Sequence, residues 1–117
     1  MKAACALPAL LLTSTAAYAV EFAYEPALDA YIDCADLYVA KALAARWTST
    51  AADLADAALA SCEPQAQALE AALVRDKDLQ LDYDGVQDSM AGTRANIRGM
   101  LIQHIVETRN AKPSQPQ

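Results

Sequence analysis

The sequence predicts an all-α protein: a disulfide-stapled antiparallel helical hairpin followed by a third long helix, in a small bundle of three to four helices. Residues 20–117 contain twenty-one alanines but few valines and isoleucines, which favours helix over strand. Apolar residues recur at spacings of three and four and do not alternate with polar residues. Two cysteines, Cys34 and Cys62, lie at equal distances from an expected turn between helices.

The first nineteen residues have the pattern of a secretory signal peptide. Lys2 precedes an apolar run from Ala3 to Leu12, and Ala17-Tyr18-Ala19 provides a small-residue cleavage site. The run covers about ten residues, whereas a transmembrane helix needs roughly twenty. We therefore expect cleavage after Ala19, loss of Cys5 with the signal, and a periplasmic or secreted mature chain with no membrane span.

The mature chain of 98 residues is long enough for one domain, which we place at residues 20–109. A first helix is expected from about Pro26 through Trp47, and Ser49 or Thr50 is suited to cap the helix that follows. The apolar face of that second helix comprises Leu54, Ala55, Ala58, Leu59 and Cys62.

Pro64 predicts a kink or a break in the second helix near residues 61–63, because proline lacks an amide hydrogen and crowds the preceding turn. The composition of residues 82–85 predicts a turn, and a last helix is expected from about Val86 to Thr108. Gly92 and Gly99 weaken that helix, and close packing against another helix is the usual reason to retain them. Residues 110–117 are expected to form a disordered tail.

The two mature cysteines are expected to form a disulfide, because export places the chain in an oxidising compartment. Each lies about 20 Å of helix from position 48, so an antiparallel hairpin that turns there brings them level. On the chain-entropy model, a loop of this size stabilises the fold by about 3.6 kcal/mol.

The charge of the chain argues against binding to nucleic acid. The formal net charge is -6, and it becomes -7 once Lys2 is removed with the signal. Residues 20–84 hold thirteen acidic and four basic side chains, whereas residues 85–117 hold two acidic and four basic ones. The last third is thus suited to pack against an acidic remainder.

No catalytic, cofactor or metal motif is evident. The one histidine, His104, is expected at the boundary of the core on the last helix, and no mature cysteine remains free to form a Cys–His pair. Asp82 and Asp84 fit two positions of an EF-hand loop around Gly85, but Gln80 occupies the position of the first ligand, and the last ligand is also missing. One histidine and two paired cysteines do not supply a zinc site.

Tyr24, Tyr31 and Tyr38 repeat every seven residues, and Trp47 follows them at the apex of the hairpin. Such a stripe fills a core or forms a recognition surface, since tyrosine and tryptophan are enriched at binding hot spots. We favour the core for the tyrosines. Trp47 is the candidate binding residue, for a protein partner that the sequence does not identify.

The signal peptide, Tyr31-x-x-Cys34, the alanine-rich run from Ala55 to Cys62 and Pro64 resemble small exported all-α proteins of Gram-negative bacteria with one intrachain disulfide. The resemblance covers residues 31–73 and implies a periplasmic location and no activity. Acid-stress periplasmic chaperones are similar in size, helicity and single disulfide, but they differ in cysteine spacing and lack the acidic first two-thirds.

Three functions follow from these observations. The first is a non-enzymatic periplasmic or secreted helical protein with a binding or structural role. The second is an acid-stress periplasmic chaperone, whose thirteen carboxylates in residues 20–84 would loosen the hairpin on protonation. The third is a small enzyme that depends on His104.

We predict that the exported protein begins at Val20, because Ala17 and Ala19 supply the small residues that a signal-peptidase site requires. The intact mass of protein purified from the periplasm checks this. A mass that includes residues 1–19 would identify the segment as an uncleaved anchor.

Overall fold

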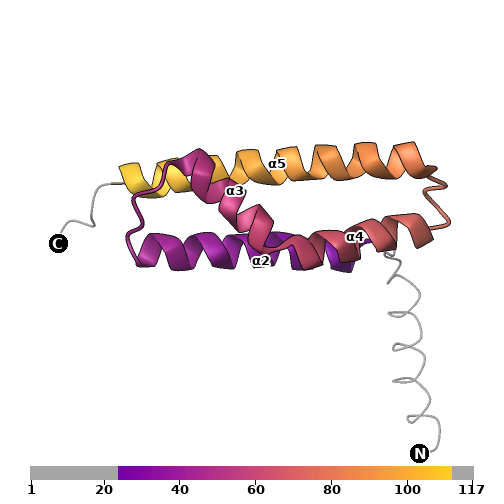
Figure 1. The fold of residues 1–117 in the computed structure, drawn as a ribbon, viewed down its shortest axis with the longest axis horizontal. Coiled ribbons are helices and arrows are strands. Elements are labelled where there is room, and N and C mark those ends of the chain that lie inside the picture. The colour runs from indigo at the N-terminus through magenta and orange to yellow at the C-terminus, as the bar shows by residue number, and fades with distance from the viewer. Residues whose placement is uncertain (1–23, 112–117) are drawn as a thin grey trace, which may run out of the picture.

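The computed structural model describes residues 24–111, so the expected signal peptide at residues 1–19 and most of the expected tail lie outside the described residues. Residues 24–111 form the helices α2 (Glu25–Ala44), α3 (Ala51–Ser61), α4 (Glu63–Arg75) and α5 (Tyr83–Asn110), and none of them forms a strand. α2 and α5 run in the same direction, and α3 and α4 return between them (Figure 1). The predicted all-α bundle is confirmed.

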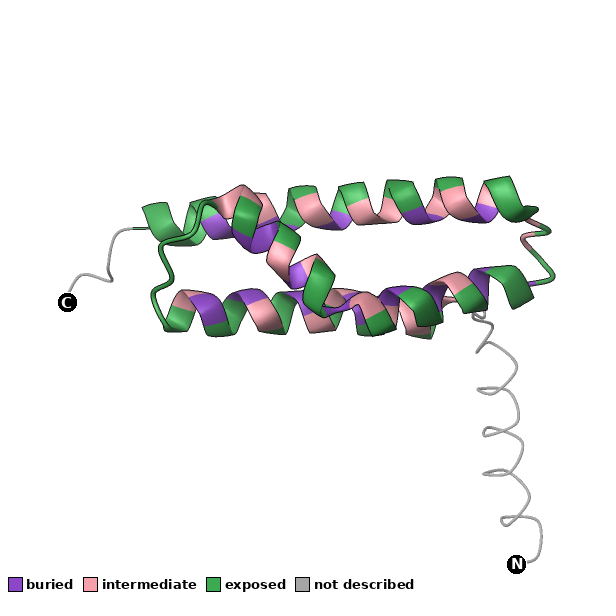
Figure 2. Ribbon diagram, viewed as in Figure 1, coloured by how far each residue is buried: buried purple, intermediate pink, exposed green. Residues whose placement is uncertain are grey.

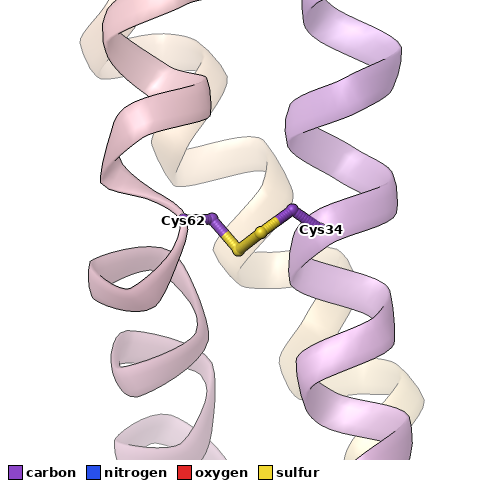
Figure 3. Close-up of a disulfide and its surroundings, with 2 residues drawn as sticks. All are labelled: Cys34 and Cys62. Carbon is purple, nitrogen blue, oxygen red and sulfur yellow. A yellow bond between two sulfur atoms is a disulfide. The ribbon is translucent and has the colours of Figure 1, made fainter.

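A disulfide joins Cys34, in the middle of α2, to Cys62, the residue that separates α3 from α4 (Figure 3). The sulfur atoms are 2.06 Å apart and the Cα atoms are 6.0 Å apart. Cys62 is fully buried, whereas Cys34 is partly exposed. The predicted pairing and the antiparallel hairpin that brings the two cysteines level are therefore confirmed.

The second helix is broken, not merely kinked, at Cys62. This residue has φ -102° and ψ 21°, and its carbonyl accepts hydrogen bonds from the amides of Gln65 (3.0 Å) and Ala66 (3.1 Å). Pro64 is in the first turn of α4, where its missing amide hydrogen removes no helical hydrogen bond. The break lets α3 pack mainly against α5 and α2 while α4 packs mainly against α2 (Figure 1).

The first helix ends three residues earlier than expected, at Ala44. Arg46 adopts a left-handed conformation with φ 59°, and the amides of Arg46 and Trp47 donate to the carbonyls of Leu43 and Ala42. This is the Schellman arrangement that terminates many helices, here with arginine in the position that usually holds glycine. Of the two proposed caps for the next helix, Thr50 is the one used: its hydroxyl accepts from the amide of Asp53 at 3.1 Å.

The last helix begins at Tyr83, within the segment that we expected to be a turn. Asp82 is its N-cap, and its carboxylate accepts a 2.7 Å hydrogen bond from the amide of Gly85. Aspartate and glycine favour both turns and helix starts, so composition alone misplaced the boundary. At the other end α5 includes Asn110, the first residue that we assigned to the tail.

The core runs along the inner faces of the helices, where buried residues recur along each helix (Figure 2). Each predicted apolar face contributes: the large fully buried side chains are those of Tyr31, Val39, Leu54, Cys62, Leu69, Leu101 and Ile105. Close packing does not explain the two helical glycines of α5. A Cβ atom at Gly92 or Gly99 would meet nothing within 4 Å, so that interpretation was wrong.

A ladder of polar pairs joins α5 to α3 and α4. The side chain of Gln87 donates to Glu70 at 3.4 Å, that of Arg94 to Glu63 at 3.1 Å, and that of Arg98 to Asp56 at 2.7 Å. The partner numbers rise as the numbers on α4 and α3 fall, as an antiparallel pairing requires. Glu63 and Asp56 are seven residues apart, whereas their partners on α5, Arg94 and Arg98, are four apart. The two spacings differ because the chain changes direction at Cys62, between Glu63 and Asp56.

Tyr31 places a phenol in the centre of this core. Its side chain is fully buried, and its hydroxyl has no hydrogen-bond partner among the described residues. Burial raises the pKa of the Tyr31 phenol; Arg94 acts to lower it and Glu63 to raise it. A raised pKa favours the neutral phenol, so this contribution to stability is complete below about pH 10 and is lost as the pH rises through the folded-state pKa.

We predict that Tyr31→Phe raises the free energy of unfolding at neutral pH by about 1 kcal/mol, because it removes a buried, unpaired hydroxyl. The variant should also lose less stability above about pH 10 than the parent. Urea unfolding at both pH values measures this, with the partly exposed Tyr38→Phe as the control. A lower free energy of unfolding for Tyr31→Phe at neutral pH would show that the hydroxyl is satisfied.

Candidate functional site

Trp47, the candidate binding residue, lies in the turn between α2 and α3 and is 46% exposed. Its ring meets that of Tyr38 edge to face, with ring centres 5.9 Å apart and planes at 86°. This is a favourable aromatic geometry, so Tyr38 holds one edge of the indole while much of the ring remains in solvent.

The backbone around Trp47 is held from two sides. From α2, the Schellman hydrogen bonds fix the residues that precede it. From α5, one guanidinium nitrogen of Arg109 donates to the carbonyl of Trp47 at 2.7 Å, and the other donates to the carbonyl of Ser49. Arg109 thereby ties the C-terminal turn of α5 to the α2–α3 turn, and the exposed indole rests on a fixed backbone.

The charged residues that line the hollow beside Trp47 are both basic, in contrast to the chain as a whole, whose net charge is -6. A shallow hollow beside the ring is lined by residues of α2, the turn and the end of α5, among them Arg46 and Arg109. No acidic residue lines it; the other lining residues are Leu43, Thr108 and Ala111. The site therefore combines an aromatic surface with two guanidinium groups.

The other residues singled out from the sequence do not join Trp47 in this site, apart from its neighbour Tyr38. Tyr31 is in the core, the position that we favoured for the tyrosines, and the partly buried Tyr24 packs against the core cluster. His104 is exposed on α5, so the expected boundary position was wrong. The carboxylate of Asp82 caps α5 by accepting from the amide of Gly85.

A second hollow was not predicted, because its walls come from segments far apart in the sequence. It lies at the opposite end of the bundle from Trp47, has a volume of about 450 Å³, and no charged residue lines it. One wall is apolar and the other belongs to α5 and is small and polar. The lining comprises Tyr24, Leu28, Leu69, Leu73, Leu79, Leu81, Ser89, Gly92, Thr93 and Asn96; we call it the leucine cleft.

Within residues 24–111 no group of three or more histidine, cysteine or acidic side chains is arranged to hold a metal ion. No helix in the same range is long and apolar enough to cross a bilayer. Comparison of the chain with protein-family models, with curated proteins and with solved structures finds no match. The functional proposal therefore rests on the geometry of the site at Trp47.

We predict that Arg109→Ala frees the turn that carries Trp47, because it removes both hydrogen bonds to the turn's carbonyls. Trp47 is the one tryptophan of the chain, so its fluorescence anisotropy reports this motion directly and should fall. The global loss of stability should be about 1 kcal/mol. Arg98→Ala, which removes an ion pair elsewhere between α5 and α3, should leave the anisotropy unchanged. Equal anisotropy in both variants would contradict the assigned role of Arg109.

Proposed function

We propose that this chain is an exported, non-enzymatic binding protein that recognises another protein through Trp47. The observation that carries the proposal is the fixed yet exposed indole: 46% of the residue is accessible, while Tyr38 and Arg109 hold its ring and its backbone. A rigid aromatic side chain loses little conformational entropy on binding, which is why such residues dominate interface energetics.

The charge around Trp47 supports one kind of partner. Arg46 and Arg109 line the hollow beside the ring, and no carboxylate does. A partner that offers an apolar side chain flanked by carboxylates would match both features, since complementary charge speeds association and fixes orientation. The expected signal peptide and the Cys34–Cys62 disulfide support a periplasmic or extracellular setting for this interaction.

An acid-triggered chaperone is the second candidate, and the polar ladder favours it. Protonation of Glu63 and Asp56 would remove the two ion pairs that join α4 and α3 to α5. The side chains of both pairs are 38–56% exposed, and pairs near the surface contribute about 0.2–1 kcal/mol each. Their sum is a minor part of a typical domain stability of about 5–15 kcal/mol, so we rank this function below binding at Trp47.

We predict that Trp47→Ala reduces capture of the partner from periplasmic extract by about thirtyfold, the loss expected for a hot spot of about 2 kcal/mol. The matched control is Val106→Ala on α5, because Val106 is 42% exposed and Trp47 is 46% exposed. Circular dichroism should show unchanged helicity and a nearly unchanged midpoint for Trp47→Ala, whereas Tyr38→Ala should lower the midpoint. Undiminished capture by Trp47→Ala, or its unfolding, would refute recognition through this residue.

The chaperone candidate makes a separate prediction about acid. At about pH 3, below the ordinary pKa of carboxyl groups, a chaperone should expose apolar surface while its disulfide stays intact. Binding of an anilinonaphthalene dye between pH 7 and pH 3 measures this. We expect little increase for a binding protein; a large, reversible increase together with suppression of client aggregation would favour the chaperone instead.

A further inference from the structure

We propose that the leucine cleft is a binding site for an uncharged amphiphilic small molecule, with an aliphatic body and one neutral hydrogen-bonding group such as a hydroxyl. The cleft lies at the opposite end of the bundle from Trp47. The proposal therefore goes beyond protein recognition through Trp47 and does not rest on it.

The size and position of the cleft carry the first step. Its volume of about 450 Å³ is within the range of about 300–1,000 Å³ that is usual for small-molecule sites. Its walls come from α2, α4, α5 and the connection between α4 and α5, residues 76–82. A ligand placed there would contact three helices that pack on one core, so the folded chain already provides most of the site.

The apolar wall of the cleft fits an aliphatic body. Leu69 and Leu73 of α4 are buried. Leu28 of α2 and Leu79 and Leu81 of the α4–α5 connection are only partly buried. An aliphatic chain laid against these leucines would remove apolar surface from water, and that burial would drive binding.

The α5 wall supplies hydrogen-bonding groups but no charge. Ser89, Thr93 and Asn96 are four and three residues apart on α5, so their side chains share one face of the helix. Within residues 24–111, none of these three side chains takes part in a hydrogen bond, so a ligand would meet no competing partner there.

The lack of charge in the lining determines the kind of ligand. No acidic or basic residue lines the cleft. A carboxylate or an ammonium group that entered would leave water without meeting a counter-charge, which is costly. A neutral hydroxyl would instead find both donors and acceptors on the α5 wall.

The backbone of the α4–α5 connection is strained where it lines the cleft. Gln80 separates Leu79 from Leu81 and has φ 50°, a left-handed conformation that residues other than glycine rarely adopt. The connection is fixed at its start by Asp76, which is 5% exposed and accepts a 3.0 Å hydrogen bond from the amide of Asp78. Strained residues of this kind cluster at ligand sites, so Gln80 is a second, independent observation that supports the proposal.

Titration of the purified protein with octanol tests the proposal, and octanoate, a chain of equal length that carries a carboxylate, is the matched control ligand. Methyl signals of labelled leucines, followed by nuclear magnetic resonance, report on the cleft. We expect octanol to shift the signals of Leu28, Leu79 and Leu81, and octanoate at neutral pH to bind at least about tenfold more weakly. Equal affinity for the two would overturn the assignment of an uncharged ligand, and unshifted signals at saturating octanol would overturn the site.

Two glycines of α5 provide a variant and its control. A Cβ atom at Gly92 or Gly99 would meet nothing within 4 Å, but only Gly92 lines the cleft. Gly92→Leu should occupy the cleft and lower the affinity for octanol at least about tenfold, whereas Gly99→Leu should leave it unchanged. Circular dichroism of both variants checks that the fold is kept. Unchanged affinity in folded Gly92→Leu would overturn the location of the site.

The polar wall has a test of its own. Thr93 is the middle one of the three polar residues, and Thr93→Val keeps the shape of the side chain while it removes the hydroxyl. The affinity for octanol should fall about fivefold, the loss expected for one hydrogen bond. Thr108→Val, near the other end of α5, should leave the affinity unchanged. Equal affinities of the two variants would overturn the role of the α5 wall in binding the hydroxyl.

Discussion

The Cys34–Cys62 disulfide joins the middle of one helix to the one residue that interrupts the helices packed against it. Because Cys62 lies between α3 and α4, the bond fixes the point at which the returning chain changes direction (Figure 3). On one side of that point α3 reaches α5, and on the other α4 lies along α2. Pro64 is tolerated because the break turns it into a first-turn residue.

The other contacts between the helices depend on the change of chain direction at Cys62. Gln87, Arg94 and Arg98 meet carboxylates on both sides of the break, and buried residues of all the described helices form one core cluster with Cys62. At one end of the bundle, Arg109 bonds to the α2–α3 turn and fixes the backbone of Trp47. The opposite end contains the leucine cleft. The Trp47 site and the leucine cleft therefore lie at opposite ends of the bundle, where helices that the core holds together meet.

Local signals in the sequence were enough to predict the helices and a cap at Ser49 or Thr50, of which Thr50 is the one used, because apolar spacing and hydroxyl chemistry act within a few residues. The disulfide was predicted from the equal distances of its two cysteines from the expected turn. The start of α5 was misplaced, because Asp82 and Gly85 suit a turn as well as a capped helix. The end of α2 was misplaced, because the left-handed residue that terminates it is Arg46 and not the glycine that usually marks such a position. Arg109 bonds to Trp47 across 62 residues of sequence, and the walls of the cleft also come from segments far apart in the chain. A single sequence does not show which distant segments lie side by side, so neither feature was predicted.

The disulfide stabilises this arrangement more than any surface ion pair does. Urea unfolding of the same protein with and without dithiothreitol, followed by circular dichroism at neutral pH, measures its contribution. With a sequence separation of 28 residues between the cysteines, reduction should lower the free energy of unfolding by about 3.6 kcal/mol. A reduced protein whose free energy of unfolding equals that of the oxidised protein would show that the disulfide does not stabilise the fold.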